Sequence, residues 1–148
     1  MKRFANIPHA VTLLFLPILL LTGCDSNSPD SDENDLEGGV LATFRVEGEL
    51  FHVWLTNTQA IQQVLDLKNG TSEANIPNGP LVAGPGAGDH NTPWSWHLDP
   101  AQTTLAEVTI EVCSGTPSYL EANVDEWVNV VGQYCPWSAE LVEVQDFR

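Results

Sequence analysis

The stretch that decides the fold is residues 42–55, which have the sequence ATFRVEGELFHVWL. Apolar side chains occupy alternate positions on both sides of Glu47-Gly48, at Ala42, Phe44 and Val46 and again at Phe51, Val53 and Leu55. Alternation with a period of two is typical of strands that bury one face, and a short turn containing Gly commonly joins such strands. The stretch therefore predicts a β-hairpin.

Two helices are predicted further along the chain. Thr56-Asn57-Thr58-Gln59 has the form of a capping box, Asn69-Gly70 supplies a C-terminal stop, and one helical face between them is apolar at Ala60, Ile61, Val64 and Leu65. Pro117 suits the first turn of a second helix that runs to about Asn123, with Ser114 or Thr116 as its N-cap.

Four more strands complete the prediction, without a regular βαβ period. Gly and Pro leave room only for a short strand at residues 81–83, and residues 94–98 form another, closed by Asp99-Pro100. The clearest strand is 106–112, in which Ala106, Val108, Ile110 and Val112 face one way, and the last is 141–144. The sequence predicts one α+β domain at residues 41–148, with a small mixed or antiparallel sheet and two helices.

The N-terminal segment has the features of an export signal. Lys2 and Arg3 precede a largely apolar run, residues 10–21, which is too short to span a bilayer as a helix. Residues 21–24, Leu-Thr-Gly-Cys, look like a bacterial lipobox, which implies cleavage before Cys24 and lipidation of that residue. We expect residues 1–23 to be a lipoprotein signal peptide; the alternative is an ordinary signal peptide with a chance cysteine.

The charge distribution excludes one class of partner. Residues 24–40, which follow the signal, are rich in acidic residues and hold one large apolar residue, Leu36, so they predict a disordered tether. Without the signal the chain has three basic residues against 20 acidic ones, a net charge of −17. Such a surface repels phosphate backbones, so we expect no nucleic-acid partner.

The two remaining cysteines, Cys113 and Cys135, favour a disulfide. Their number is even once Cys24 is assigned to the lipid anchor, and an exported protein meets an oxidising compartment. The alternative is a pair of thiol ligands to a metal ion, but the two cysteines lack the C-x-x-C spacing that such sites commonly have.

Candidate chemistry centres on the segment His97-Leu98-Asp99. The two polar side chains share one face of an extended segment, and His90 and His52 could join them in space. His90, His97 and Asp99 are the candidate ligands of a metal site, although no H-E-x-x-H motif or comparable cluster is present. The more common arrangement would have His97 hydrogen-bonded in a partly buried strand and Asp99 opening an Asp-Pro turn.

The chain has five tryptophans, an unusual number for its size. Most are expected to fill a small core, whereas Trp94 and Trp137 are the better surface candidates because each follows a proline in the repeated tripeptide Pro-Trp-Ser. Exposed tryptophans are suitable platforms for a sugar ring or a protein partner.

Several of these motifs, taken in order, resemble one family. They are residues 93–100 (PWSWHLDP), Ile110-Glu111-Val112-Cys113, Tyr119, Asp125-Glu126 and Cys135-Pro136-Trp137-Ser138. The chain is similar, over about residues 44–144, to a family of small secreted domains often labelled calmodulin-binding-protein-like, after the N-terminal domain of a protein called BP-seventy-four. The resemblance implies a compact α+β domain with its two cysteines paired, and carries over no catalytic residues.

The chain departs from this family's pattern at two positions. It has Ser114 where an Asp usually follows the first cysteine, and Glu140 where an Arg is common. The label also implies no calmodulin binding here, because calmodulin prefers basic amphipathic helices and this sequence offers none.

The sequence therefore predicts a binding module without catalytic activity or cofactor, held by lipidated Cys24 on the extracytoplasmic side of a membrane in a bacterial cell envelope. Its expected ligand is a glycan, a peptide or a cation, bound near Trp94, His97, Asp99 and Trp137. The alternatives are a metal-assisted hydrolase that uses the His97 and Asp99 region, and a purely structural envelope lipoprotein.

Overall fold

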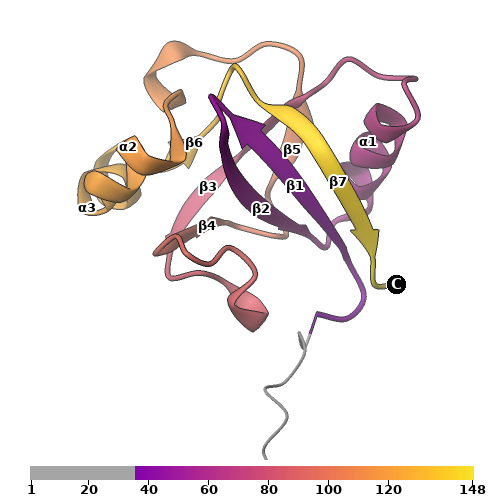
Figure 1. Ribbon diagram of the computed structural model, residues 1–148, viewed down its shortest axis with the longest axis horizontal. Coiled ribbons are helices and arrows are strands. Elements are labelled where there is room, and N and C mark those ends of the chain that lie inside the picture. Colours follow the sequence, from indigo (N-terminus) through magenta and orange to yellow (C-terminus); the bar gives the residue numbers. More distant parts are fainter. Residues whose placement is uncertain (1–35) are drawn as a thin grey trace, which may run out of the picture. The chain divides into compact units, whose positions relative to one another are not determined.

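A computed structural model describes residues 36–148 (Figure 1). The elements in chain order are β1 (Val40–Val46), β2 (Glu49–Leu55), α1 (Thr58–Lys68), β3 (Ile76–Ala83), η1 (Ala87–Asp89), β4 (Trp96–Leu98), β5 (Thr104–Ala106), η2 (Glu111–Cys113), α2 (Pro117–Ala122), α3 (Val124–Glu126), η3 (Trp127–Val131), β6 (Gln133–Tyr134) and β7 (Glu140–Asp146). The predicted signal peptide, Cys24 and most of the predicted tether lie outside the described residues. Between residues 36 and 148, no helix combines the length and the apolar character that a membrane crossing requires.

The predicted hairpin is confirmed as β1 and β2. The two strands pair antiparallel from Val40 opposite Leu55 to Val46 opposite Glu49. Glu47 and Gly48 both have positive φ angles, 49° and 91°, as the two central residues of a type I′ turn require. This turn matches the twist of the flanking strands, so the short local sequence sets the register of the hairpin.

The fold is α+β, as predicted, but its strands form two antiparallel sheets rather than one. The first sheet has the order β2-β1-β7, and β7 extends the predicted last strand by a few residues, mainly at its C-terminal end. In the second sheet β3 pairs with β5, β6 and β4 along successive parts of its length. The predicted strand at residues 81–83 is therefore only the end of the eight-residue strand β3.

The prolines of β3 explain why most of this strand was not expected. Pro77 and Pro80 lack the N–H that a regular ladder uses, which usually argues against a central strand. Here the partners are short, and Pro80 still supplies its carbonyl, which accepts a hydrogen bond of 2.9 Å from the Asp99 N–H. A strand with several short partners tolerates residues that one long partner would not.

The core lies between the two sheets and is closed by helices at its sides (Figure 1). Tyr134 is fully buried at its centre, with ring centroids 5.5 Å from Phe51, 5.2 Å from Trp96 and 6.0 Å from Trp127, all edge-on. Its hydroxyl donates to the Gly115 carbonyl at 2.9 Å, so burial leaves no polar atom of the phenol without a partner.

Both predicted helices are present, and one cap differs. The N-cap of α1 is Asn57 rather than Thr56: its side chain accepts a hydrogen bond from the Ala60 N–H at 2.7 Å. The helix ends at Asn69 and Gly70, as predicted, with a positive φ at the glycine. Helix α2 begins at Pro117 with Thr116 as N-cap, also as predicted. Elements α3, η3 and β6 were not expected.

The strand predicted at residues 106–112 is wrong. Only Thr104–Ala106 form a strand, β5, and residues 107–110 continue without a partner before η2. The reason is the length of β3, whose first residue, Ile76, already pairs with Ala106. The sequence alternates as a strand does, but no neighbouring strand of the described chain lies beside it.

The fold begins earlier than the predicted boundary at Leu41. Leu36, assigned to the tether, is 3% exposed and packs in a small cluster with Leu41, Trp54 and Phe147. Two backbone hydrogen bonds of 2.9 Å, between Gly38 and Phe147 and between Phe147 and Gly39, tie this segment to the C-terminus. A single apolar residue in an acidic run is therefore enough to anchor the end of the tether.

Candidate functional site

The tryptophans divide between core and surface largely as expected. Trp54, Trp96 and Trp127 are buried, and Trp137 is exposed. Trp94 is half-buried: it stacks on Trp96 at 6.2 Å, and its indole N–H donates to the Leu50 carbonyl at 2.8 Å. Trp94 thus closes the edge of the core, and the one polar atom of its side chain already has a partner.

His90 and His97 are neighbours, with ring centroids 5.7 Å apart. His90 Nδ1 lies 2.9 Å from the Ala87 carbonyl and His97 Nδ1 lies 2.7 Å from the Gly84 carbonyl. Because a carbonyl only accepts, each Nδ1 carries the proton, and Nε2 of each neutral ring is left as an acceptor. Nε2 of His90 is buried without a partner in the described chain.

Electrostatics favour the neutral form of these histidines. Burial lowers the pKa of His90; its hydrogen bond to Ala87 opposes this shift, and the charges of His97 and His52 add to it. Burial also lowers the pKa of His52, against the opposing charge of Glu143. The proton arrangement of His90 and His97 suits metal ligands, because a coordinating histidine commonly donates from its other ring nitrogen to a carbonyl.

A metal centre made of His90, His97 and Asp99 is nevertheless not formed. Asp99 Oδ1 accepts from the Ala101 N–H at 2.9 Å and Oδ2 accepts from the Gln102 side-chain amide at 2.7 Å. These bonds, that of Gln102 first, hold the pKa of Asp99 below its usual range. The carboxylate thus stabilises the Asp-Pro turn, and no three His, Cys, Asp or Glu side chains in the described part are placed to hold one ion.

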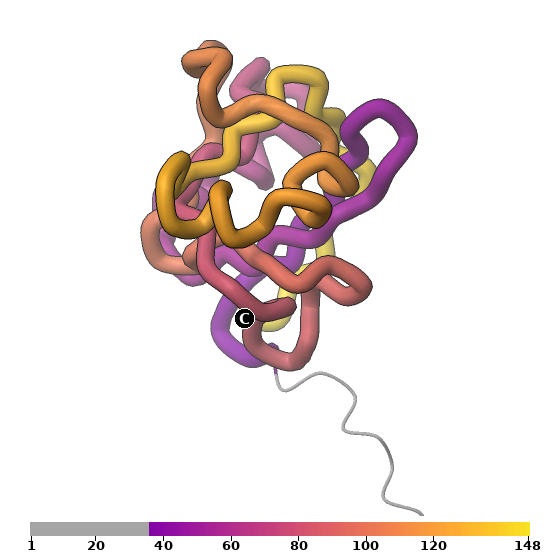
Figure 2. Tube along the Cα trace, turned by 90° about the vertical axis from the view of Figure 1, so that its left-hand side faces the viewer, coloured from indigo at the N-terminus to yellow at the C-terminus, as the bar shows by residue number. Residues whose placement is uncertain are grey.

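The predicted surface of four residues does not form. No hydrogen bond or ring contact within residues 36–148 joins Trp137 to Trp94, His97 or Asp99. In both views of the domain, the loop of residues 84–92 and the segment of residues 107–113 lie at opposite ends (Figures 1 and 2). The candidate site therefore has to be sought around Trp137 or around the histidines, but not across both.

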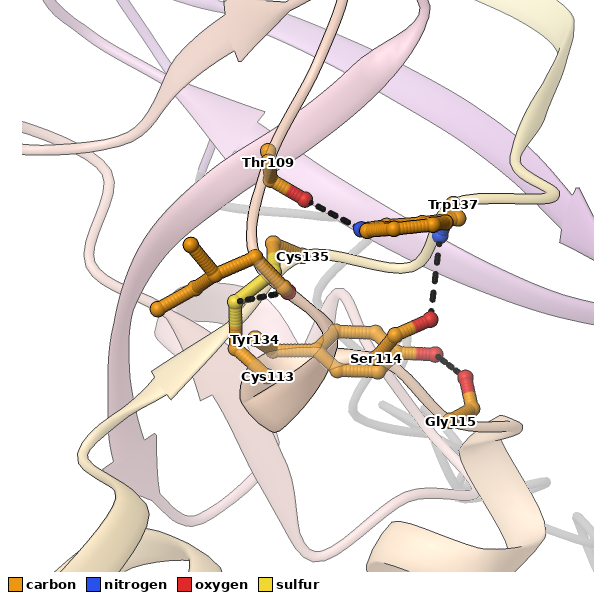
Figure 3. Close-up of a disulfide and its surroundings, with 8 residues drawn as sticks. Thr109, Cys113, Ser114, Gly115, Tyr134, Cys135 and Trp137 are labelled. Carbon is orange, nitrogen blue, oxygen red and sulfur yellow. Dashed lines mark hydrogen bonds between the residues drawn. A yellow bond between two sulfur atoms is a disulfide. The ribbon is translucent and has the colours of Figure 1, made fainter.

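The surface around Trp137 is a groove of about 240 Å³, which we call the Trp137 groove; it is lined by Ile76, Glu107, Val108, Thr109 and Trp137. The Trp137 indole N–H donates to Thr109 Oγ1 at 2.6 Å, so its ring is fixed against the segment (Figure 3). Large apolar side chains stand in water along this segment: Val108 is 82% exposed, Ile110 64% and Val112 66%, beside Trp137 at 46%. Such a concentration of exposed apolar residues marks an interaction surface.

The predicted disulfide is present and holds this segment in place. Cys113 and Cys135 are linked, with Cα atoms 5.2 Å apart, and the Cys135 N–H donates to the Cys113 carbonyl at 2.7 Å. Both sulfur atoms lie 3.4 Å from the Ile110 carbonyl oxygen, a contact rather than a hydrogen bond because neither sulfur carries a proton (Figure 3). The thiol metal pair, the alternative from the sequence, is thereby replaced.

The two departures from the family pattern have identifiable partners. Ser114 Oγ accepts from the Trp137 backbone N–H at 3.2 Å, so it helps fix the tryptophan (Figure 3). Glu140 lies 3.7 Å from Arg45 across the β1–β7 pair.

The groove is acidic at its rim. Glu107 lines it, and Glu111 lies in the same exposed segment. The described residues include three basic side chains: Arg45 pairs with Glu140, Arg148 pairs with Asp146, and Lys68 lies beside β7. None of these three lines the groove.

Sequence reasoning found Trp137 and the disulfide but missed the aliphatic half of this site. Val108, Ile110 and Val112 were expected on one face of a strand because they alternate with polar residues. One signal was available: the alternation with Glu107 and Glu111 runs right up to the cysteine, with no turn residue that would end a strand. Periodicity alone does not say which face is covered.

Fold and site together define a disulfide-linked α+β domain of two antiparallel sheets with an exposed apolar groove. A family model described as the BP-seventy-four N-terminal domain matches residues 40–148, and the chain belongs to that family. No curated protein and no solved structure matches the chain.

Proposed function

We propose that this protein is a lipid-anchored, extracytoplasmic module that binds a polypeptide through the Trp137 groove and is not an enzyme. The observation that carries the proposal is the exposure of Val108 beside Trp137, in a segment fixed by the disulfide. Exposed apolar side chains gain free energy when a partner covers them, about 25 cal/mol for each Å² removed from water. A preformed surface recovers this gain without first ordering its own chain.

A peptide fits this groove better than the other ligand classes expected from the sequence. A sugar ring needs hydrogen-bonding side chains beside the aromatic platform, and the Trp137 indole N–H is already bonded to Thr109. A cation needs several convergent oxygen or nitrogen ligands, and Glu107 is the single carboxylate in the groove lining. Aliphatic side chains next to a tryptophan suit an apolar peptide.

The location is proposed from the sequence. Lys2 and Arg3, the apolar run of residues 10–21 and the lipobox that ends at Cys24 occur in the order of a bacterial lipoprotein signal. The acidic spacer that follows would hold the domain away from the membrane surface, because like charges extend a chain. An acidic domain on such a spacer is free to meet envelope partners.

A peptide-display selection against the detergent-solubilised protein tests the binding function. We expect enriched peptides whose binding is lost in Val108→Ser and in Trp137→Ala. The matched control is Val130→Ser, because Val130 is 77% exposed but lies in η3, outside the groove. Urea midpoints near that of the parent protein show that the variants are folded. Selection of no groove-dependent peptide would favour a purely structural envelope role instead.

A further inference from the structure

We propose that the partner of the Trp137 groove is an extended peptide in which Lys or Arg alternates with apolar residues, and that it adds as a β-strand along residues 107–110. This inference rests on the proposed binding function and adds to it the mode of binding and the chemistry of the partner. It is carried by a contrast between this segment and the other strand edges of the domain.

The outer edge of β2 is covered by side chains from the loop before β4. The His52 N–H donates to Asn91 Oδ1 at 2.7 Å, and the Leu50 carbonyl accepts from the Trp94 indole N–H at 2.8 Å. Asn91 also donates through Nδ2 to the Trp96 carbonyl of β4, at 2.7 Å. One loop thereby satisfies free backbone groups of two strands.

The edges of β5 and β7 are covered as well. The Gln63 side-chain amide accepts from the Leu105 N–H at 3.0 Å and donates to the Leu105 carbonyl at 2.9 Å, as a neighbouring strand would. Strand β7 has a register shift opposite Thr43 and Phe44, and Lys68 Nζ lies 3.5 Å from the Val144 carbonyl. Bulges, lysines and side-chain caps are the devices by which proteins block strand pairing.

Residues 107–110 have no such protection. No backbone N–H of residues 107–110, and no carbonyl of residues 107–109, forms a hydrogen bond with another residue of the described chain. The backbone at Ile110 is extended, with φ −94° and ψ 151°, and the side chains of Val108 and Ile110 are exposed. A row of free amide groups next to apolar side chains is the template that an added strand uses.

The segment is also held in place for this role. Strand β5 fixes its start through pairing with β3, and the bond from Trp137 to Thr109 fixes its middle. The Cys113–Cys135 disulfide fixes the chain just after it. Binding would therefore cost little ordering of the protein, which favours a short peptide partner.

The charges select the chemistry of the partner. Val108 and Ile110 alternate with Glu107 and Glu111 along the segment, and Glu107 lines the groove. Opposite charges on facing positions of paired strands are favourable, and like charges are not. A peptide that alternates Lys or Arg with apolar residues is complementary, whereas a second copy of this chain would place acidic residues against acidic residues.

The test uses a fluorescent peptide in which Lys and Val alternate, with binding to the detergent-solubilised protein measured by anisotropy. Two N-methylated forms carry methyl groups on alternate residues, one on each set. In an added strand only one set of amides faces the protein. We expect one form to bind at least about tenfold more weakly and the other to bind like the parent. Amide NMR shifts should concentrate at residues 107–110.

The controls separate this inference from the binding function. A peptide that alternates Glu and Val should bind at least about tenfold more weakly than the Lys peptide. Equal binding of both N-methylated forms, or of the Glu peptide, would overturn strand addition while leaving groove binding intact. A dimer that Val108→Ser dissociates in sedimentation would assign the edge to a second copy and overturn the peptide proposal. If the display selection also yields no groove-dependent peptide, the binding function itself fails.

Discussion

Reduction of the Cys113–Cys135 disulfide should remove a large part of the stability of this domain. The bridge closes a loop of sequence separation 22. In the chain-entropy model a loop of this length restricts the unfolded state by about 3.4 kcal/mol at room temperature. With an unfolding entropy of about 2.1 cal/mol/K per residue, a domain the size of residues 36–148 should melt about 14 °C lower.

The measurement keeps both sulfur atoms in place. Cys113 and Cys135 are 2% and 0% exposed, so the bridge should be reduced in guanidinium and the protein refolded with the reductant present. Urea unfolding of the oxidised and reduced forms, followed by tryptophan fluorescence, then isolates the loss of the cross-link. The double variant Cys113→Ala/Cys135→Ala should lose more than reduction does, because it also leaves a space beside Ile76 and Val131.

A loss below about 1 kcal/mol on reduction would refute this reasoning. It would mean that the unfolded chain between the cysteines is already restricted, or that the segment after β5 contributes little to the cooperative unfolding unit. A loss near the expected value, with the peptide binding also weakened, would connect the stability of the bridge with the order of residues 107–110.

Three further results are expected. Gln63→Ala should destabilise the domain by about 1–2 kcal/mol in urea unfolding, because both backbone groups of Leu105 lose their partner, while the exposed neighbour Gln62→Ala should change stability little. His90 has a lowered pKa in the folded state, so its contribution to stability is complete above the unfolded value near 6.5 and declines as the pH falls below it; His90→Gln should flatten the stability profile between about pH 7 and pH 5, and an unchanged slope would contradict the assignment. Cys24→Ser should move the protein from the detergent phase to the aqueous phase in Triton X-114 partitioning, and retention in the detergent phase would rule out the lipid anchor.

The hairpin and the two helices followed from the sequence because their determinants are local. Glu47-Gly48 sets the turn between β1 and β2, and Asn69-Gly70 ends α1. The cap of α1 was displaced by one residue, since Thr56 and Asn57 both carry a side chain able to cap and only the geometry selects Asn57. Half of the candidate site was also predictable, because Trp137 follows a proline and the cysteines form an even pair.

Whether an apolar residue is covered depends on what lies beside it, and that is a non-local property. Val108, Ile110 and Val112 have the pattern of a buried strand but are exposed, since β3 begins at Ile76 and no other strand of the described chain lies alongside them. Leu36 shows the reverse: its acidic surroundings predict disorder, yet Trp54 and Phe147 provide a site that buries it. Periodicity records what a segment can do, and the neighbouring elements decide what it does.

The sequence by itself determined the α+β class, the hairpin and the pairing of Cys113 with Cys135, because each follows from turn chemistry, alternation or counting. Only the tertiary structure separated Trp137 from Trp94 and His97 and left residues 107–110 as an unguarded edge. Hydrogen bonds from side chains distant in the sequence cover the edges of β2, β5 and β7, and no local pattern encodes which backbone groups such side chains will reach.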